Sequence, residues 1–373
     1  MRTCMVVPVI VAVMSIASVA VALDISVHSG VNYNYWDSDA NDRGSQTYVP
    51  VTIGAGYQDI DVKVLTAFAH TDGSPPDGSP ESLSSVIDTK VNLSYSIVKK
   101  MPVDMLIGVD FNLPTGKTKL DFSELQLLRN PDLLTITRYG EGFNVNPTVT
   151  IAKQADRWAI GVGAGYVWRG EYDFSEVLME YDPGDIFNVT AEAVYAFSDR
   201  WQGRLFGEWA VYDTDELGVQ EYYQEGDYLM GGVGVDYIAA RWEVSLSGKG
   251  ILRGKSDFQE QNLSLVTEEQ NSYGDEYQMD LSGLLRLSPK TSLRSSLQFL
   301  YLMENDYGED SPLYFGKKQK ISLGLGLQHQ FASQWSGRAG LNGYLLDEDR
   351  NWYHDDDREY QGLIVDLAVS KVF

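Results

Sequence analysis

Histidine and cysteine, which most often hold a metal or serve as base and nucleophile, are rare in this chain. The histidines are His28, His70, His329 and His354, and none of them forms the i, i+4 pair that chelates zinc from one helix. A single cysteine, Cys4, allows neither a disulfide framework nor a zinc ribbon. The spacing of these residues therefore predicts no catalytic or metal centre.

Two short motifs imitate ligand sites. Residues 116–118, Gly-Lys-Thr, end like a phosphate-binding loop, but that motif needs a glycine at 111, where Phe111 stands. The acidic run from Asp37 begins like a calcium loop, yet Asp42 stands where a glycine is needed and Tyr48 where the last glutamate belongs. Neither motif predicts a cofactor, and we expect none.

The N-terminus reads as a secretory signal peptide. Arg2 precedes an apolar run from Met5 to Val21, and residues 20–22, Ala-Val-Ala, form a small-residue cleavage site. We expect residues 1–22 to be removed with Cys4, leaving one mature domain over 23–373. The apolar run is short for a spanning anchor, and after it no stretch of eighteen apolar residues occurs.

Strict alternation of apolar with polar or small residues is the main pattern of the mature chain. It is clear over Val103–Leu113, and over Trp158–Arg169 the apolar set faces alanine and glycine. Since successive side chains of a strand point to opposite faces, each segment predicts a strand with one greasy and one wet face. We predict sixteen such strands, at 23–36, 46–58, 60–70, 85–98, 103–113, 143–153, 157–169, 186–197, 200–212, 228–238, 241–253, 277–288, 291–303, 319–331, 334–346 and 360–373.

The connections between these segments alternate between short and long. Short turns on one rim and long loops on the other are typical of an all-β, transmembrane, antiparallel up-and-down β-barrel in the bacterial outer membrane. A merged hairpin would lower the strand number to fourteen, and a soluble β-sandwich or propeller is the alternative. Trp158, Trp201, Trp242 and Trp335 each follow a short turn, which predicts a girdle at the inner lipid interface.

The net charge of −24 resides in the long loops, at 37–45, 71–84, 114–142, 170–185, 213–227, 254–276, 304–318 and 347–359. They hold 39 of the 53 acidic residues but only 10 of the 29 basic ones. An acidic exterior repels nucleic acid. Runs such as His354–Asp357 suggest divalent cations near lipopolysaccharide, and a merely solvated, repulsive surface is the alternative.

If the apolar faces contact lipid, the other faces line a lumen. A barrel of sixteen strands is wide enough for an aqueous channel. We predict a lining of mixed charge, which gives no clear ion preference: Asp104, Asp110, Arg169, Glu192, Arg204, Lys249, Arg253, Asp280, Arg286 and Arg294.

The third long loop, residues 114–142, is too apolar for an exposed tip. We expect it to fold into the barrel as a constriction or gate, packing against outer loops being the alternative. The apolar residues that predict this are Leu120, Phe122, Leu125, Leu128, Leu133 and Leu134.

Residues 108–116, GVDFNLPTG, with 140–143, GEGF, and 161–166, GVGAGY, carry a family resemblance. Over roughly residues 100–175 the chain resembles the MetA-type phenol-degradation transporters, a group linked to FadL-like hydrophobic-compound transporters. The resemblance implies uptake of apolar or aromatic compounds. FadL-like barrels have fourteen strands and an N-terminal plug, whereas strands here begin near Leu23, so the fatty-acid mechanism does not carry over.

The sequence thus predicts a passive channel for small solutes, with no enzymatic activity. A structural or adhesive barrel that binds partners through its acidic loops, and a hydrolase with a site at the rim, are the alternatives. The expected partners are lipid, lipopolysaccharide, small-molecule solutes and the barrel-assembly machinery, which would read the terminal Phe373 as its signal. A homo-oligomer stays open.

Overall fold

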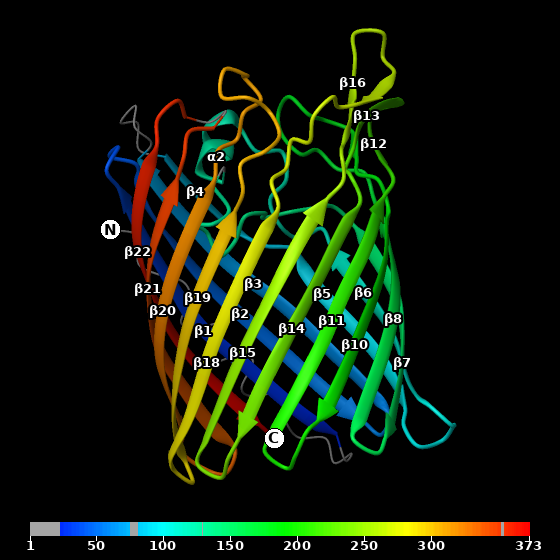
Figure 1. The fold of residues 1–373 in the computed structure, drawn as a ribbon, viewed down its shortest axis with the longest axis vertical. Helices are drawn as coiled ribbons and strands as arrows, with labels where there is room; N and C mark the ends of the chain where they lie inside the picture. The colour runs from blue at the N-terminus through cyan, green and yellow to red at the C-terminus, as the bar shows by residue number, and fades with distance from the viewer. Residues whose placement is uncertain (1–22, 75–80, 129, 352–353) are drawn as a thin grey trace.

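The computed structural model describes residues 23–74, 81–128, 130–351 and 354–373, so the predicted signal peptide lies outside the described residues. Its main sheet is an antiparallel barrel in which each strand pairs with its neighbours along the chain (Figure 1). The barrel strands are β1 (Asp24–Ser38), β2 (Arg43–Tyr57), β3 (Ile60–Ser74), β4 (Glu81–Val86), β5 (Thr89–Ile97), β6 (Asp104–Leu113), β7 (Asn144–Ala155), β8 (Trp158–Arg169), β10 (Ile186–Ala196), β11 (Trp201–Tyr212), β14 (Tyr228–Ile238), β15 (Trp242–Arg253), β18 (Glu276–Ser288), β19 (Thr291–Leu302), β20 (Lys318–Gln330), β21 (Trp335–Glu348) and β22 (Arg358–Val372).

The barrel closes between its first and last strands. β1 and β22 are paired from Ser26↔Val372 to Ser38↔Tyr360, so the sheet has no free edge. β4 and β5 both pair with β3 and together count as one barrel strand, which confirms the predicted number of sixteen. The continuous strand expected at 85–98 is wrong in one detail: it is interrupted at residues 87–88, where the Asp88 carboxylate binds the backbone of residues 114–142.

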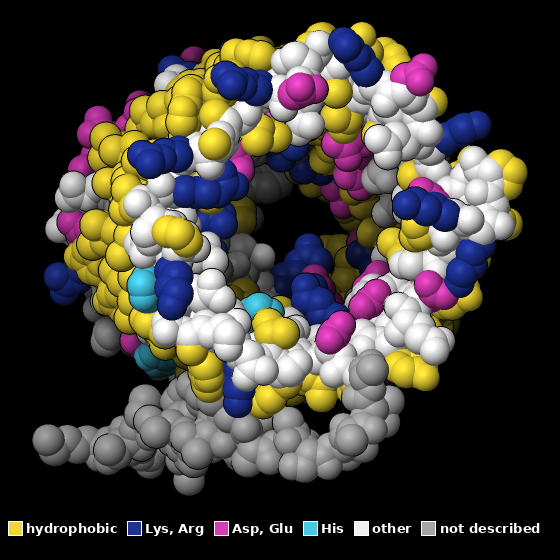
Figure 2. Space-filling model, turned by 90° about the horizontal axis from the view of Figure 1, so that it is seen from below, with side chains coloured by type: hydrophobic (Ala, Val, Ile, Leu, Met, Phe, Trp, Pro, Cys, Tyr) yellow, Lys and Arg dark blue, Asp and Glu magenta, His cyan; other side chains and the backbone are white. Residues whose placement is uncertain are grey.

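The outward faces form an apolar belt. Outward side chains such as Ile160, Leu205 and Leu323 are 50–61% exposed, as required of groups that contact lipid tails. Figure 2 shows hydrophobic side chains around the outside of the wall. The inward faces carry mainly polar, charged or glycine residues, with apolar ones where residues 114–142 pack, which confirms the alternation seen in the sequence.

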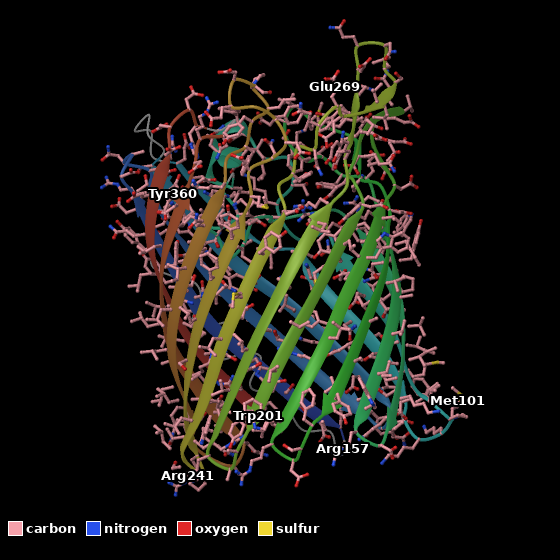
Figure 3. All side chains as sticks on the ribbon, in the orientation of Figure 1. Met101, Arg157, Trp201, Arg241, Glu269 and Tyr360 are labelled. Atoms are coloured by element: carbon pink, nitrogen blue, oxygen red, sulfur yellow. The ribbon has the colours of Figure 1, made fainter. Side chains whose placement is uncertain are left out.

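Aromatic rings border the belt at both ends. Near the short turns Trp201 stacks on Tyr237 with ring centroids 4.7 Å apart, and Figure 3 places Trp201 beside the turn residues at the lower rim. Trp158 and Trp168 lie ten residues apart on β8. At about 3.3 Å per residue and a tilt of about 40°, these rings are about 25 Å apart along the barrel axis, close to the height of a lipid-facing belt.

The long loops contain ordered structure that the alternation did not reveal. Three of them form a second, five-stranded sheet above the barrel, from β9 (Tyr181–Asp182), β12 (Thr214–Leu217), β13 (Gln220–Gln224), β16 (Asp257–Gln259) and β17 (Leu265–Thr267). A short helix, α2 (Phe122–Leu127), lies within residues 114–142. Among the described residues, no helix is long and apolar enough to span a membrane.

Candidate functional site: the lumen and its third loop

The lumen is the first part of the candidate site. Seen from the end with the short turns, the barrel is hollow and charged side chains of both signs line its wall (Figure 2). By the alternation of each strand, all ten residues predicted to line the lumen stand at inward-facing positions. That they line a path for solutes stays a prediction.

Several of these charges are already partnered. Arg286 forms an ion pair with Glu243, and Arg253 forms one with Glu225 at 3.3 Å. Arg169 bonds the Gly184 carbonyl and lies 3.4 Å from Asp215, so it fastens the loop sheet to the rim rather than facing open water. The wall is therefore less highly charged than a count of ionisable residues implies.

Residues 114–142, called loop 3 from here on, lie against the inner face of the barrel. Helix α2 begins with a capping box in which the Asp121 side chain accepts from the Glu124 amide and Glu124 reaches back to the Asp121 amide. The Ser123 hydroxyl donates a hydrogen bond to the Asp121 carboxylate. This bond is the main reason that the pKa of Asp121 is lowered. The helix rests on β4 and β3, and its Leu127 packs close to Gly73.

Two apolar clusters hold loop 3 on the wall. Leu120, Leu127 and Tyr139 are buried against small inward residues of β3 and against Leu83 of β4. Leu133 is buried among Trp36, Tyr344, Leu346 and Tyr360, which face inward from β1, β21 and β22. Of the six residues predicted to form the constriction, Leu120 and Leu133 are buried, Leu125, Leu128 and Leu134 are half-buried, and Phe122 is 76% exposed.

Polar side chains on the inner wall bind the backbone of loop 3. Gln46 of β2 donates to the Ile136 carbonyl at 2.8 Å and accepts from the amides of Thr135 and Ile136. Asn34 of β1 donates to the Leu133 carbonyl. Burial raises the pKa of Tyr139 to about 12, so its phenol stays neutral and shares a hydrogen bond of 2.9 Å with Thr71.

The middle of loop 3, at Asp132, is fixed by an ion cluster that Asp132 forms with Lys318, Glu348 and His354. Lys318 is 4% exposed, and its ammonium group lies 2.8 Å from Asp132 and 3.0 Å from Glu348. The other oxygen of Glu348 lies 3.5 Å from the His354 ring. His354 is 9% exposed and its ring belongs to this cluster, and no cluster of three metal-ligating side chains occurs in the described part of the chain; divalent cations at the outer loops stay a prediction.

Asp88 joins the two ends of loop 3. At the interruption between β4 and β5, its carboxylate accepts from the Gly116 amide at 2.8 Å, the Glu141 amide at 2.7 Å and the Asn112 side chain at 2.7 Å. A side chain at position 116 would meet the Tyr139 carbonyl at 1.9 Å, so the two ends approach only because Gly116 is glycine. Gly116 and Glu141, whose amides bind Asp88, both lie within the motifs that carry the family resemblance.

Replacing Asp88 by asparagine is expected to loosen loop 3 at its base. The amide keeps the shape of the carboxylate but offers one acceptor oxygen to three donors, a loss of about 1–3 kcal/mol. The refolded D88N barrel should unfold at a lower temperature in heat-modifiability gels and should be cut faster by protease within 114–142. D110N is the matched control, because the carboxylate of Asp110 accepts one bond, from Asn92. Equal behaviour of D88N and D110N would contradict the role assigned to Asp88.

Loop 3 divides the space at the extracellular end from the space below it. Above it, Pro131 contributes to two adjoining cavities of about 550 and 540 Å³. One is lined by the aromatic rings of Tyr223, Phe258, Tyr273, Phe315 and Tyr360, and the other by Leu120, Phe122, Leu125, Leu128 and Phe174. On the other side Thr135 lines a polar cavity of about 450 Å³. The first of these cavities is also lined by charged residues, among them Arg253, Lys318 and Glu348, so a solute meets aromatic and charged groups together above loop 3 and mainly polar walls below it.

Sequence reasoning missed the residues that fix loop 3. Asn34 and Gln46 occupy inward positions of predicted strands, whereas Lys318 ends the predicted loop 304–318 and proves to be the first residue of β20. Nothing in the alternation reveals that their partners lie in loop 3, roughly 90 to 190 residues away along the chain.

A closed sheet of sixteen strands with an apolar belt, two aromatic borders and a charged, hollow interior defines an outer-membrane β-barrel. No protein-family model matches the sequence, and no curated protein is similar to it. Among solved structures, the chain is similar to OccAB1 of Acinetobacter baumannii (10% identity, TM-score 0.48, covering 93% of this chain and 96% of that one). It is also similar to OprD of Pseudomonas aeruginosa (8%, 0.45, 94% and 95%) and to the CymD monoaromatic hydrocarbon channel (12%, 0.46, 94% and 88%).

Proposed function

We propose that this protein is a passive, non-enzymatic channel through which small solutes cross the outer membrane. The observation that carries the proposal is a hollow barrel whose inner wall is polar and whose one large inward loop is anchored to that wall. Sixteen strands enclose more space than side chains fill, so water and small solutes can occupy it. Loop 3 acts in this proposal as a fixed constriction.

The preferred solutes carry an apolar or aromatic part. Each cavity above loop 3 has a group of leucine or aromatic side chains in its wall, beside polar and charged ones, and Phe122 stands exposed in one of them. The resemblance of residues 100–175 to MetA-type transporters supports the same preference. Since this barrel has sixteen strands, the FadL-like architecture of fourteen strands is not carried over.

Recording single-channel currents from the refolded barrel in planar bilayers tests the proposal. Stable conductance steps that phenol or benzyl alcohol reduces are the expected result. A barrel that is heat-modifiable on gels, and therefore folded, but electrically silent would contradict the channel. It would favour the adhesive alternative, whereas release of fatty acid or peptide fragments would favour a hydrolase.

The remaining expectations belong to the same proposal. Lipopolysaccharide lies against the outer loops, and the barrel-assembly machinery reads Phe373, whose amide donates to the Ile25 carbonyl of β1 at 2.8 Å. A homo-oligomer of the barrel is compatible with lipopolysaccharide at the outer loops and with recognition of Phe373.

A further inference from the structure

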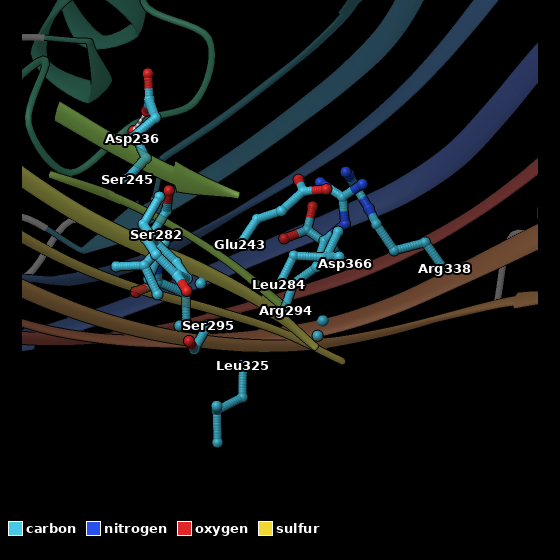
Figure 4. A pocket seen from close by; sticks show the side chains of 18 of the residues that line it. Asp236, Glu243, Ser245, Ser282, Leu284, Arg294, Ser295, Leu325, Arg338 and Asp366 are labelled. Carbon is cyan, nitrogen blue, oxygen red and sulfur yellow. Dashed lines mark hydrogen bonds between the residues drawn. The ribbon is translucent and has the colours of Figure 1, made fainter. Parts of the chain in front are cut away.

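The lower half of the lumen contains a charged chamber. A cavity of about 610 Å³ is lined from five strands by Asp236, Glu243, Arg294, Arg338 and Asp366 among other residues. The polar cavity below loop 3 shares Arg294, Arg338 and Asp366 with it, so the two are parts of one space. Figure 4 shows Glu243, Asp366, Arg294 and Arg338 pointing toward one another.

Each carboxylate of the chamber has a partner within the wall. Asp236 accepts from the hydroxyl of Ser245 and from Gln202 at 3.1 Å. Glu243 forms its ion pair with Arg286. Asp366 accepts from Asn32 of β1 at 2.7 Å. The negative charges are therefore stabilised without Arg294 or Arg338.

The two arginines have no such partner. Among the residues that the structure describes, no carboxylate lies within 4.0 Å of the Arg294 or Arg338 guanidinium. Arg294 of β19 donates to the Gln328 side chain of β20 at 3.2 Å, and Gln328 is the register partner of Arg338 of β21. Both guanidinium groups thus stand beside the same β20 residue, at the lower end of the lumen.

The wall between them leaves room for a ligand. On β20 the inward positions next to Gln328 are Gly326 and Gly324, and on β21 Gly340 follows Arg338 on the same face. Asp366 borders these glycines from β22, and the two arginines, which have no ion-pair partner among the described residues, face the remaining space, where one anion can reach both of them. Guanidinium groups in particular bind the planar, two-oxygen geometry of a carboxylate.

We propose that Arg294 and Arg338 form a binding subsite for the carboxylate of a small organic acid with an aromatic or apolar body. The inference rests on the proposed function, because the subsite lies inside the lumen. The body of such an acid fits among the leucine and aromatic side chains above loop 3, and below Thr135 its carboxylate meets Arg294 and Arg338. The count of lumen charges alone gives no ion preference. Because Arg294 and Arg338 have no ion-pair partner in the described part of the chain, the lumen prefers an anion at these two residues.

Block of the single-channel current by benzoate tests the subsite. Four refolded barrels are compared: the wild type, the double variant R294Q/R338Q, the double variant R294K/R338K and K249Q. Benzoate should block the wild type, and the glutamine pair should weaken that block about ten-fold or more, since hydrogen bonds to charged groups are lost. The lysine pair should retain part of it. In a salt gradient, the reversal potential of the glutamine pair should move toward cation preference.

K249Q is the matched control, because Lys249 of β15 stands at an inward-facing position but lines neither of these two cavities. It should move the reversal potential in the same direction while leaving benzoate block nearly unchanged. Benzyl alcohol, which has the ring without the carboxylate, should act equally on the wild type and the glutamine pair. Heat-modifiability of every variant shows that the barrel is folded.

The outcomes separate the two proposals. A folded barrel without current overturns the channel itself. A conducting barrel in which benzoate blocks the wild type and R294Q/R338Q equally overturns the subsite alone. Block by phosphate as strong as block by benzoate, lost in the glutamine pair, overturns the assignment to organic acids in favour of an inorganic oxyanion.

Discussion

Deleting residues 119–137 is expected to raise the single-channel conductance about two-fold or more, because the segment occupies part of the cross-section of a sixteen-stranded lumen. The ion preference should also change. Asp132 leaves with the segment, so Lys318 and Lys320, which it contacts, face the lumen with less negative charge beside them. The reversal potential in a salt gradient should therefore move toward anions.

The structure shows where the deletion can be closed. Gly140 lies against Lys117 and Thr118, so a short glycine-serine linker can join residues 118 and 138 while the bonds from Asp88 to Gly116 and Glu141 remain. The control is a deletion of residues 261–263, at the tip between β16 and β17, because this loop projects away from the barrel. Unchanged conductance and selectivity in a folded 119–137 deletion would show that loop 3 is no constriction.

The barrel could be predicted from the sequence because its signal is local. A strand with one lipid face and one wet face alternates with period two, and each segment, such as Trp158–Arg169, can be recognised without knowing its neighbours. The interruption at Asp88 could not be predicted in this way. Its cause is a set of bonds to Gly116 and Glu141, which lie 28 and 53 residues further along the chain.

The same reasoning explains what could be known of the candidate site. The apolar composition of loop 3 indicates that it must be covered, and the structure covers it with the inner wall. The sequence also identifies Arg286 and Arg294 as lumen residues, but it does not distinguish them. Only the register of β15, β18 and β19 shows that Arg286 reaches Glu243 whereas Arg294 reaches an uncharged glutamine.

Replacing Lys318 by methionine is expected to release the middle of loop 3, around Asp132, from the barrel wall. Methionine fills a similar volume but leaves Asp132 without its cation, while Glu348 keeps His354 and the side-chain amides of Asn130 and Asn351. Removing one member of a buried ion cluster costs about 3–5 kcal/mol, because a charge then stays buried without compensation. Asp132 can avoid that cost by moving into water, which takes residues 130–134 away from the wall. K318M should therefore show flickering currents, faster proteolysis in loop 3 and a lower unfolding temperature.

Lys317 provides the matched control, one residue away on the same chain segment. Its pair with Asp349, at 3.4 Å, joins side chains that are 49% and 31% exposed, and such a surface pair contributes about 0–1 kcal/mol. K317M should resemble the wild type. If K318M and K317M give equally quiet currents at neutral pH, the ion cluster does not hold loop 3, and the apolar contacts of Leu133 with Trp36 and Tyr344 must suffice.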